Sequence, residues 1–228
     1  MTDYRKRVFG SHRLTKAVLL LVLSFVMILG VSLTANASAK SKAMKAYKKF
    51  LSKKNVVVIP KGTTMDYFSG KKYSSSPRSN LQFAIGYINN DKVPELFVRT
   101  KPSVPYSSKC CAVFTCKGKT LYRLFAGDPY DSITGYYKKT GYFATFSSTE
   151  GTPYYNYLHR QDKTRRVQVA YVFFDGDPYD VYDEYVFNRV DCSRTVYYQK
   201  VAAVTKRKKL SKLKWYSNTS SKRKSKLK

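Results

Sequence analysis

The clearest helical pattern in the chain lies over residues 41–53. Apolar side chains recur there at intervals of three and four residues, and lysines fill most positions between them. That spacing places the apolar groups on one side of a helix, so we predict an amphipathic helix packed against a folded domain. A helix lying on a membrane surface is the alternative. The apolar positions are Ala43, Met44, Ala46, Tyr47, Phe50 and Leu51.

After this helix, short apolar or aromatic runs alternate with turn residues such as Gly, Asp, Asn and Lys. Runs of this length predict strands joined in an antiparallel meander. The expected strands are 56–59, 81–88, 96–99, 112–115, 121–125, 133–137, 142–146, 154–158, 167–174, 181–187 and 195–198. Hairpin turns are expected at 89–92, 117–118 and 138–141, and an exposed loop at 71–80.

One pentapeptide, Gly-Asp-Pro-Tyr-Asp, occurs twice, at residues 127–131 and 176–180. Each copy follows an aromatic-rich, strand-like run, so we infer a supersecondary unit used twice. The predicted fold is therefore mainly β, an antiparallel meander in a propeller-like or sandwich arrangement. An N-terminal helix precedes it and a basic C-terminal tail follows it.

The first 39 residues have the order typical of a secretory signal peptide. Basic residues precede an apolar run at 17–33, and Ala-x-Ala cleavage sequences follow that run. An uncleaved N-terminal membrane anchor is the alternative. We expect a secreted or cell-surface protein with a signal peptide at 1–39, a single β-rich domain at 40–204 and a basic tail at 205–228. A short helix on Val204, Leu210 and Leu213 is expected before the tail, and the tail itself is expected to be a short helix or disordered.

The charge is concentrated at the two ends of the remaining chain. The whole sequence has a formal net charge of +29; residues 40–54 hold seven lysines and no acid, and eleven of residues 206–228 are Lys or Arg. Such segments bind polyanions. A solubilising, disordered tail is the alternative. The candidate polyanion-binding residues are Lys206, Arg207, Lys208, Lys209, Lys212, Lys214, Lys222, Arg223 and Lys224.

The predicted export signal indicates which polyanions these basic segments would bind. Outside a cell they are anionic lipid headgroups, phosphate-rich envelope polymers and acidic glycans, and nucleic acid would bind only incidentally. Most of the 21 tyrosines are expected to pair across strands, although an exposed row could stack on sugars. We therefore predict an exported, cationic, cell-envelope-associated interaction protein.

No sequence motif identifies a reaction. The mature chain has one histidine, His159, and three glutamates, and no phosphate-binding glycine loop. A Cys–His pair or a pair of carboxylates would be needed for hydrolysis, and no spacing singles one out. We therefore predict a protein that is not an enzyme. A secreted hydrolase of wall or dietary polymers is one alternative, and a calcium-dependent binding module is the other.

Four cysteines fall within the predicted domain: Cys110, Cys111, Cys116 and Cys192. In an exported chain an even number permits two disulfides. Adjacent cysteines strain the bridge geometry, so Cys110 and Cys111 are not expected to pair with each other. Buried thiols that act as small apolar groups are the equal alternative, and a zinc site is disfavoured because the usual C-x2-C spacing is absent.

Four segments together resemble a group of secreted proteins from gut-dwelling Firmicutes. These proteins carry a helix like 46–51, an acidic turn of the pattern D-x-N-x-D-G-x-P-E-L like 87–96, a tyrosine-rich meander like 135–141 and a basic end like 215–219. The resemblance would cover nearly all of the mature chain. It implies a β-rich extracellular domain and does not imply an activity.

In that pattern the acidic turn looks like a calcium loop, and calcium is the one cofactor to consider. Here Tyr87 replaces the first Asp and Lys92 replaces the Gly, while Asn89, Asp91 and Glu95 remain. Because calcium takes six to eight oxygens, we expect this loop to have lost tight binding and to be a hairpin turn with Glu95 in solvent. A second acidic cluster is the better metal candidate, through Asp175, Asp177 and Asp180 with Asp183 and Glu184 nearby.

Overall fold

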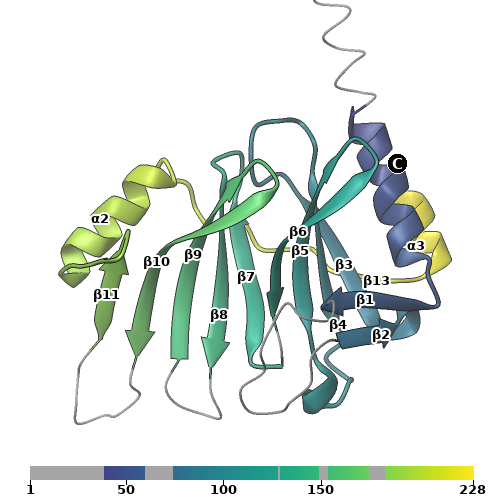
Figure 1. Cartoon of the computed structure of the whole chain (residues 1–228), viewed down its shortest axis with the longest axis horizontal. Helices are drawn as coiled ribbons and strands as arrows, with labels where there is room; N and C mark the ends of the chain where they lie inside the picture. Colours follow the sequence, from purple (N-terminus) through teal and green to yellow (C-terminus); the bar gives the residue numbers. More distant parts are fainter. Residues whose placement is uncertain (1–38, 60–73, 128, 149–153, 175–182) are drawn as a thin grey trace, which may run out of the picture. The chain divides into compact units, whose positions relative to one another are not determined.

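A computed structural model describes residues 39–59, 74–127, 129–148, 154–174 and 183–228. Its described part is mainly β, with a helix at 39–51 and two further helices near the C-terminus (Figure 1). Every strand pairs antiparallel to its neighbours, which confirms the predicted fold class. The strands are β1 (Asn55–Ile59), β2 (Ser74–Pro77), β3 (Leu81–Gly86), β4 (Glu95–Thr100), β5 (Cys111–Lys117), β6 (Thr120–Gly127), β7 (Asp131–Tyr137), β8 (Tyr142–Ser148), β9 (Tyr154–Asp162), β10 (Arg165–Phe174), β11 (Glu184–Phe187), β12 (Val190–Asp191) and β13 (Tyr216–Ser217).

These strands form a small two-stranded sheet, β1-β2, and two larger sheets. The five-stranded sheet has the order β13-β3-β4-β5-β6, and the six-stranded sheet has the order β12-β11-β10-β9-β8-β7. Side chains from both larger sheets share one apolar cluster, in which Phe125 of β6 meets Phe143 of β8 with ring centroids 6.4 Å apart. The two larger sheets therefore share part of one core.

The repeated pentapeptide has a definite place in this topology. Its first copy connects β6 with β7 and so leads the chain from one large sheet to the other. Asp128 of that copy, and the whole second copy at 176–180, lie outside the described residues.

The N-terminal helix, residues 39–51, packs against the five-stranded sheet, as its apolar spacing predicts. Tyr47 and Leu51 are fully buried, and the Phe50 ring lies 4.9 Å from the Phe114 ring of β5. The Tyr47 hydroxyl donates to the carbonyl of Pro94 at 2.8 Å. The buried phenol therefore keeps a hydrogen bond while its ring fills the core.

The described part of the loop expected at 71–80 forms β2 and the 3-10 helix η1 (Arg78–Asn80). β2 pairs with β1, and Ser76 is buried. A serine-rich segment has little intrinsic preference for a strand, but β1 needs a partner for its backbone groups. The need of β1 for a partner strand arises from tertiary structure and cannot be inferred from the local sequence of 71–80.

Residues 195–198 were expected to form a strand and instead belong to the helix α2 (Arg194–Val204). Ser193 caps this helix, since its hydroxyl accepts a backbone N–H of the first turn at 3.4 Å. Tyr197 is buried, and its ring meets that of Tyr185 in β11 at 5.5 Å. Capping and the burial of Tyr197 on the six-stranded sheet outweigh the strand preference of Thr, Val and Tyr.

Residues 205–228, which we call the C-terminal strap, are part of the domain rather than a tail outside it. Residues 40–228 form one unit. Backbone hydrogen bonds join Ser211 to Tyr136 of β7 in both directions, at 2.8 and 3.2 Å. β13 then pairs with β3, and α3 (Ser220–Lys226) follows. The strap therefore links the six-stranded sheet to the five-stranded one.

The short helix expected on Val204, Leu210 and Leu213 is absent from the described strap. Val204 is the last residue of α2, and left-handed backbone at Lys206 and Arg207, with φ of 56° and 54°, follows the end of that helix. Leu213 instead packs against the core cluster that both sheets share. Partial burial of Leu213 in an extended segment therefore replaces the local helix.

The close contact of the strap with β7 gives a first prediction. A Cβ atom at Gly135 would lie 2.6 Å from the Ser211 carbonyl oxygen and 3.0 Å from Leu210 Cγ. Gly135→Ala should therefore lower the free energy of unfolding by about 1–3 kcal/mol, because backbone must shift to admit the methyl group. Urea unfolding measures this, with Ser132→Ala, at an exposed position of the same strand, as control. Equal stability of Gly135→Ala and wild type would show that the strap does not lie against β7.

Candidate polyanion-binding surface

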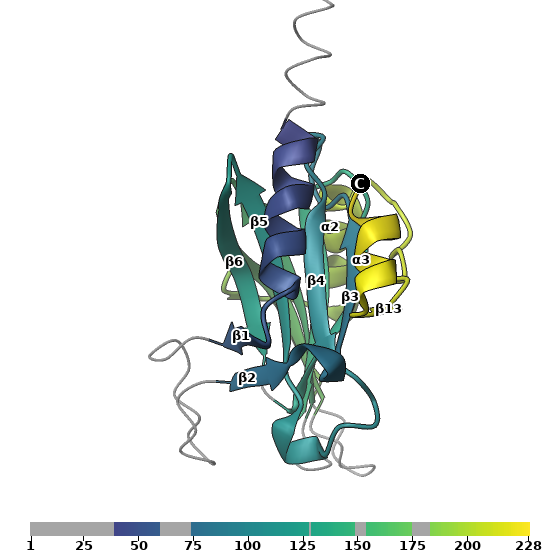
Figure 2. The same ribbon diagram turned by 90° about the vertical axis from the view of Figure 1, so that its right-hand side faces the viewer.

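The strap brings the C-terminal lysines next to the N-terminal helix. Asn218 and Leu51 are 167 residues apart in sequence, yet Asn218 Nδ2 donates to the Leu51 carbonyl at 3.0 Å. Arg78 of η1 also donates to the Ser52 carbonyl, at 3.0 Å. Both views show α3 beside the N-terminal helix (Figures 1 and 2). The two lysine-rich segments, expected to flank the domain, therefore lie side by side.

The charged side chains of these two segments are all cations. The helix buries Ala43, Met44, Tyr47 and Leu51 and leaves its lysines in solvent. Neither residues 40–54 nor the strap contains an acid. We call the exposed lysines of residues 40–54 and 220–228 the basic face: Lys40, Lys42, Lys45, Lys48, Lys49, Lys53, Lys54, Lys222, Lys224, Lys226 and Lys228.

One predicted member of the binding set has a different role. Arg223 is buried, with 7% of its surface exposed, and its Nη1 donates to the Asn218 carbonyl at 2.9 Å and to Asn218 Oδ1 at 2.8 Å. Burial, together with the charge of Arg78, lowers the pKa of Arg223. Arg223 therefore holds Asn218 in place and is not presented to a ligand.

The remaining predicted cations divide into two groups. Lys222 and Lys224 lie in α3 on the basic face. The others are exposed along the connection between α2 and β13, where Lys208 Nζ donates to the carbonyl of Lys138 at 2.8 Å. These are Lys206, Arg207, Lys208, Lys209, Lys212 and Lys214.

All four cysteines carry thiols in the structure. Cys111 packs in the core shared by the two sheets, and Cys192 packs in the cluster beneath α2. Cys116 lies on the same strand as Cys111, five residues further on. Five residues of strand span about 16 Å, so these two cannot be bridged. Other pairings stay predictions; Cys110 is buried next to β5.

The acidic turn at 87–96 is closed by its own hydrogen bonds. Asn89 Nδ2 donates to Asp91 Oδ2 at 3.0 Å, and Asp91 Oδ1 accepts from the Val93 N–H at 2.9 Å. Lys92 has a left-handed φ of 65°, at the position that the D-x-N-x-D-G pattern gives to glycine. In the described part of the chain no group of three His, Cys, Asp or Glu side chains could hold a metal. The better metal candidates, Asp175, Asp177 and Asp180, lie outside it.

Glu95 does not lie in solvent as predicted. Its side chain is 0% exposed, with Oε2 accepting from the Ile88 N–H at 2.8 Å and Oε1 accepting from Thr115 Oγ1 at 3.4 Å. The amide of Gln161 also bonds this carboxyl group. Burial raises the pKa of Glu95 to about 8, with a smaller contribution from Asp91 and an opposing one from the Ile88 N–H. Glu95 is therefore largely neutral at pH 7.

His159 is the second ionisable group in this interior. Its Nε2 lies 2.9 Å from Thr145 Oγ1, and the rings of Phe125 and Phe143 lie 5.7 and 5.0 Å away. Burial, and to a lesser extent Arg166, lowers the pKa of His159 to about 3. The imidazole is therefore neutral and enclosed by aromatic rings.

Tyrosines gather on one face of β9 and β10. Tyr155 and Tyr157 stack at 5.5 Å and 9°, and Phe173 lies 4.8 Å from Tyr155. These rings are half-buried, and burial raises the pKa of Tyr157 to about 12. Tyr171 of β10 pairs with Tyr157 of β9, which is the cross-strand pairing predicted for tyrosine.

Comparison with protein-family models, curated proteins and solved structures gave no match. In the described ranges, no helix has the length and apolar character needed to cross a membrane.

Proposed function

We propose that this protein binds anionic polymers of a cell envelope through the basic face and acts as an interaction protein rather than as an enzyme. The observation that carries the proposal is the hydrogen bond from Asn218 to the Leu51 carbonyl, because it joins two lysine-rich segments into one surface. The sequence pattern of residues 1–39 supports export, which would place this surface outside the cell.

Electrostatics accounts for binding without a shaped pocket. Each Lys or Arg close to an anionic surface contributes roughly 1 kcal/mol, and salt screens that attraction. Several exposed lysines on two neighbouring helices can engage one flexible polymer at once. Phosphate is the shared chemistry of the expected partners, whether it belongs to a lipid headgroup or to a soluble envelope polymer.

The test compares two variants that lose the same charge. The first replaces Lys49, Lys222 and Lys224 by Gln on the basic face; the control replaces Lys163, Arg165 and Arg189, which are exposed at hairpins of the six-stranded sheet. The first should weaken binding to polyphosphate about tenfold to a hundredfold at low salt, and the control less than about threefold.

Two probes separate the sources of phosphate. Polyphosphate in solution represents an envelope polymer, and vesicles that contain phosphatidylglycerol represent a lipid surface. A selective loss with the basic-face variant on either probe supports the proposal and names the source. Equal losses for the two variants on both probes would refute it, because total charge and not the basic face would then govern binding.

A further inference from the structure

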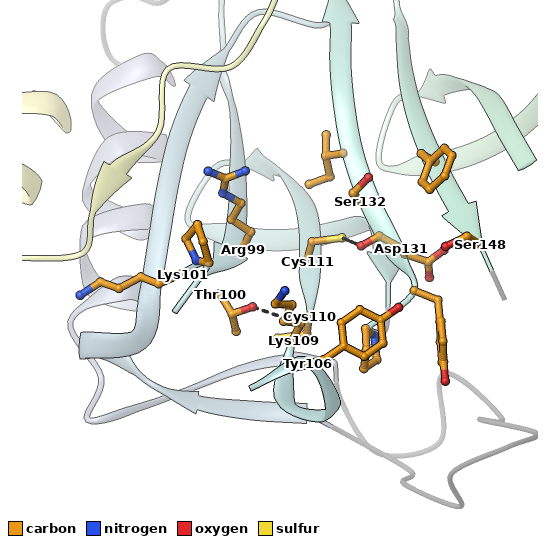
Figure 3. Close-up of a pocket in the computed structure, with 15 residues that line it drawn as sticks. Arg99, Thr100, Lys101, Tyr106, Lys109, Cys110, Cys111, Asp131, Ser132 and Ser148 are labelled. Atoms are coloured by element: carbon orange, nitrogen blue, oxygen red, sulfur yellow. Dashed lines mark hydrogen bonds between the residues drawn. The ribbon is translucent and has the colours of Figure 1, made fainter. Parts of the chain in front are cut away.

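A pocket of about 350 Å³ opens where the β4–β5 connection meets the start of β7 (Figure 3). Its volume lies in the range of small-ligand sites. The β4–β5 connection supplies Tyr106 and Lys109 to its wall, and the first pentapeptide copy supplies Pro129, Tyr130 and Asp131. The pocket is therefore built partly from the repeated motif that the basic face leaves unexplained.

Gly127 of the pentapeptide allows the residues of this pocket wall to pack closely. A Cβ atom there would lie 2.4 Å from the Asp131 Cβ and 3.0 Å from Cys111 Sγ, so only glycine lets Asp131 fold back over this position. Cys111 Sγ donates to the Asp131 carbonyl at 3.6 Å, and Figure 3 shows the two residues directed toward each other. Tyr130 is thereby presented on the same wall.

An aromatic ring and a cation adjoin each other in the pocket. Tyr106 is 48% exposed, its ring meets that of Tyr130 edge to face at 5.4 Å, and Lys109 Nζ lies 5.3 Å from the Tyr106 ring. An exposed ring can stack on the apolar face of a sugar, and an ammonium beside it can bind a phosphate or carboxylate. Arg99 also lines the pocket, but Gln82, which accepts from its Nε at 2.9 Å, and the Trp215 ring, at 4.3 Å, hold its guanidinium. Lys101 points away from Cys111 and Asp131 in Figure 3.

We infer that this pocket binds a single sugar unit that carries a phosphate or carboxylate group. The side chains of Tyr106 and Lys109 recognise its ring and its charge, and the hydroxyl of Ser148 accepts a hydrogen bond from one of its hydroxyls. The inference rests on the proposed function, because the anionic polymer would supply the unit. It makes the protein selective for sugar-containing polyanions.

Calorimetric titration of the full-length chain with four compounds tests this inference. Glucose 6-phosphate or glucuronic acid should bind, and glucose and inorganic phosphate should each bind at least about tenfold more weakly, since each lacks one of the two recognised features. Tyr106→Ala should weaken binding of the anionic sugar about tenfold, and Lys109→Gln about fivefold. Tyr198→Ala, at an equally exposed tyrosine of α2 with 49% exposure, is the control and should leave affinity unchanged.

Three results would overturn the inference: no binding of either anionic sugar, equal binding of glucose, or unchanged affinity in Tyr106→Ala. The basic-face variant separates this site from the proposed function. It should lower affinity for polyphosphate and leave affinity for the anionic sugar intact, whereas the pocket variants should do the reverse. If the sugars do not bind and polyphosphate binding still depends on the basic face, only the inference about the pocket fails.

Discussion

Deletion of residues 214–228 should abolish cooperative folding of the domain. The deletion removes β13, α3 and the half-buried Trp215, which packs on the shared core and lies 4.3 Å from the Arg99 guanidinium. It also removes the buried Leu227 and the hydrogen bond from Asn218 to Leu51. Because a domain is stable by only about 5–15 kcal/mol, losing a strand pairing and several buried side chains exceeds the margin.

Near-ultraviolet circular dichroism and urea unfolding measure the effect. The matched control keeps the segment and changes only its charge, with Lys222, Lys224 and Lys228 replaced by Gln, and should unfold like wild type. An unchanged unfolding midpoint in the deletion variant would mean that residues 214–228 are dispensable for folding. Loss of polyanion binding after such a deletion therefore cannot by itself locate the binding residues, whereas substitution of exposed lysines can.

Glu95→Gln should remove a fall in stability that extends from about pH 4.3 to about pH 8. Burial raises the pKa of Glu95 to about 8, so the folded state favours the protonated form. The resulting stabilisation is fully present below the unfolded pKa of about 4.3 and is lost as pH rises through about 8. At pH 9 the variant should exceed wild type by on the order of a few kcal/mol. The glutamine keeps an oxygen that accepts from the Ile88 N–H.

His159 makes stability depend on pH in the opposite direction. Burial lowers its pKa to about 3, so the folded state favours neutral imidazole, and this contribution is lost as pH falls from about 6.5 through 3. Urea unfolding at pH 5, 7 and 9 should therefore show that Glu95→Gln removes the fall in stability between pH 5 and pH 9 and keeps the loss that His159 causes below about pH 6.5. The same change of stability between pH 5 and pH 9 in Glu95→Gln and wild type would show that this carboxyl group is not buried in the neutral form.

Features set by local sequence could be predicted, and features set by distant contacts could not. The N-terminal helix follows from the spacing of Tyr47, Phe50 and Leu51 alone. Glu95 was expected in solvent because its turn is polar, yet Thr115 and the amide of Gln161 satisfy it from strands far along the chain. Only the fold brings those partners together.

The basic face illustrates the same limit. Composition identified both lysine-rich segments, but Asn218 and Arg223 carry no sequence signal that would reveal their hydrogen bond. Arg223 looked like one more surface cation, whereas the structure buries it. The pocket was also missed, and the signal that could have found it is the pentapeptide itself, because its Gly127 and Asp131 pack on each other.

The central claim is that the two lysine-rich segments act as one polyanion-binding surface. Salt elution from immobilised polyphosphate tests it most directly, with Lys48 and Lys49 replaced by Gln in one variant, Lys222 and Lys224 in a second, and Lys163 and Arg165 replaced in a control. We predict that the first two variants elute at similarly reduced salt, that the combined variant elutes lower still, and that the control elutes with wild type. Elution of all variants at one salt concentration, or a loss confined to one segment, would contradict a single surface.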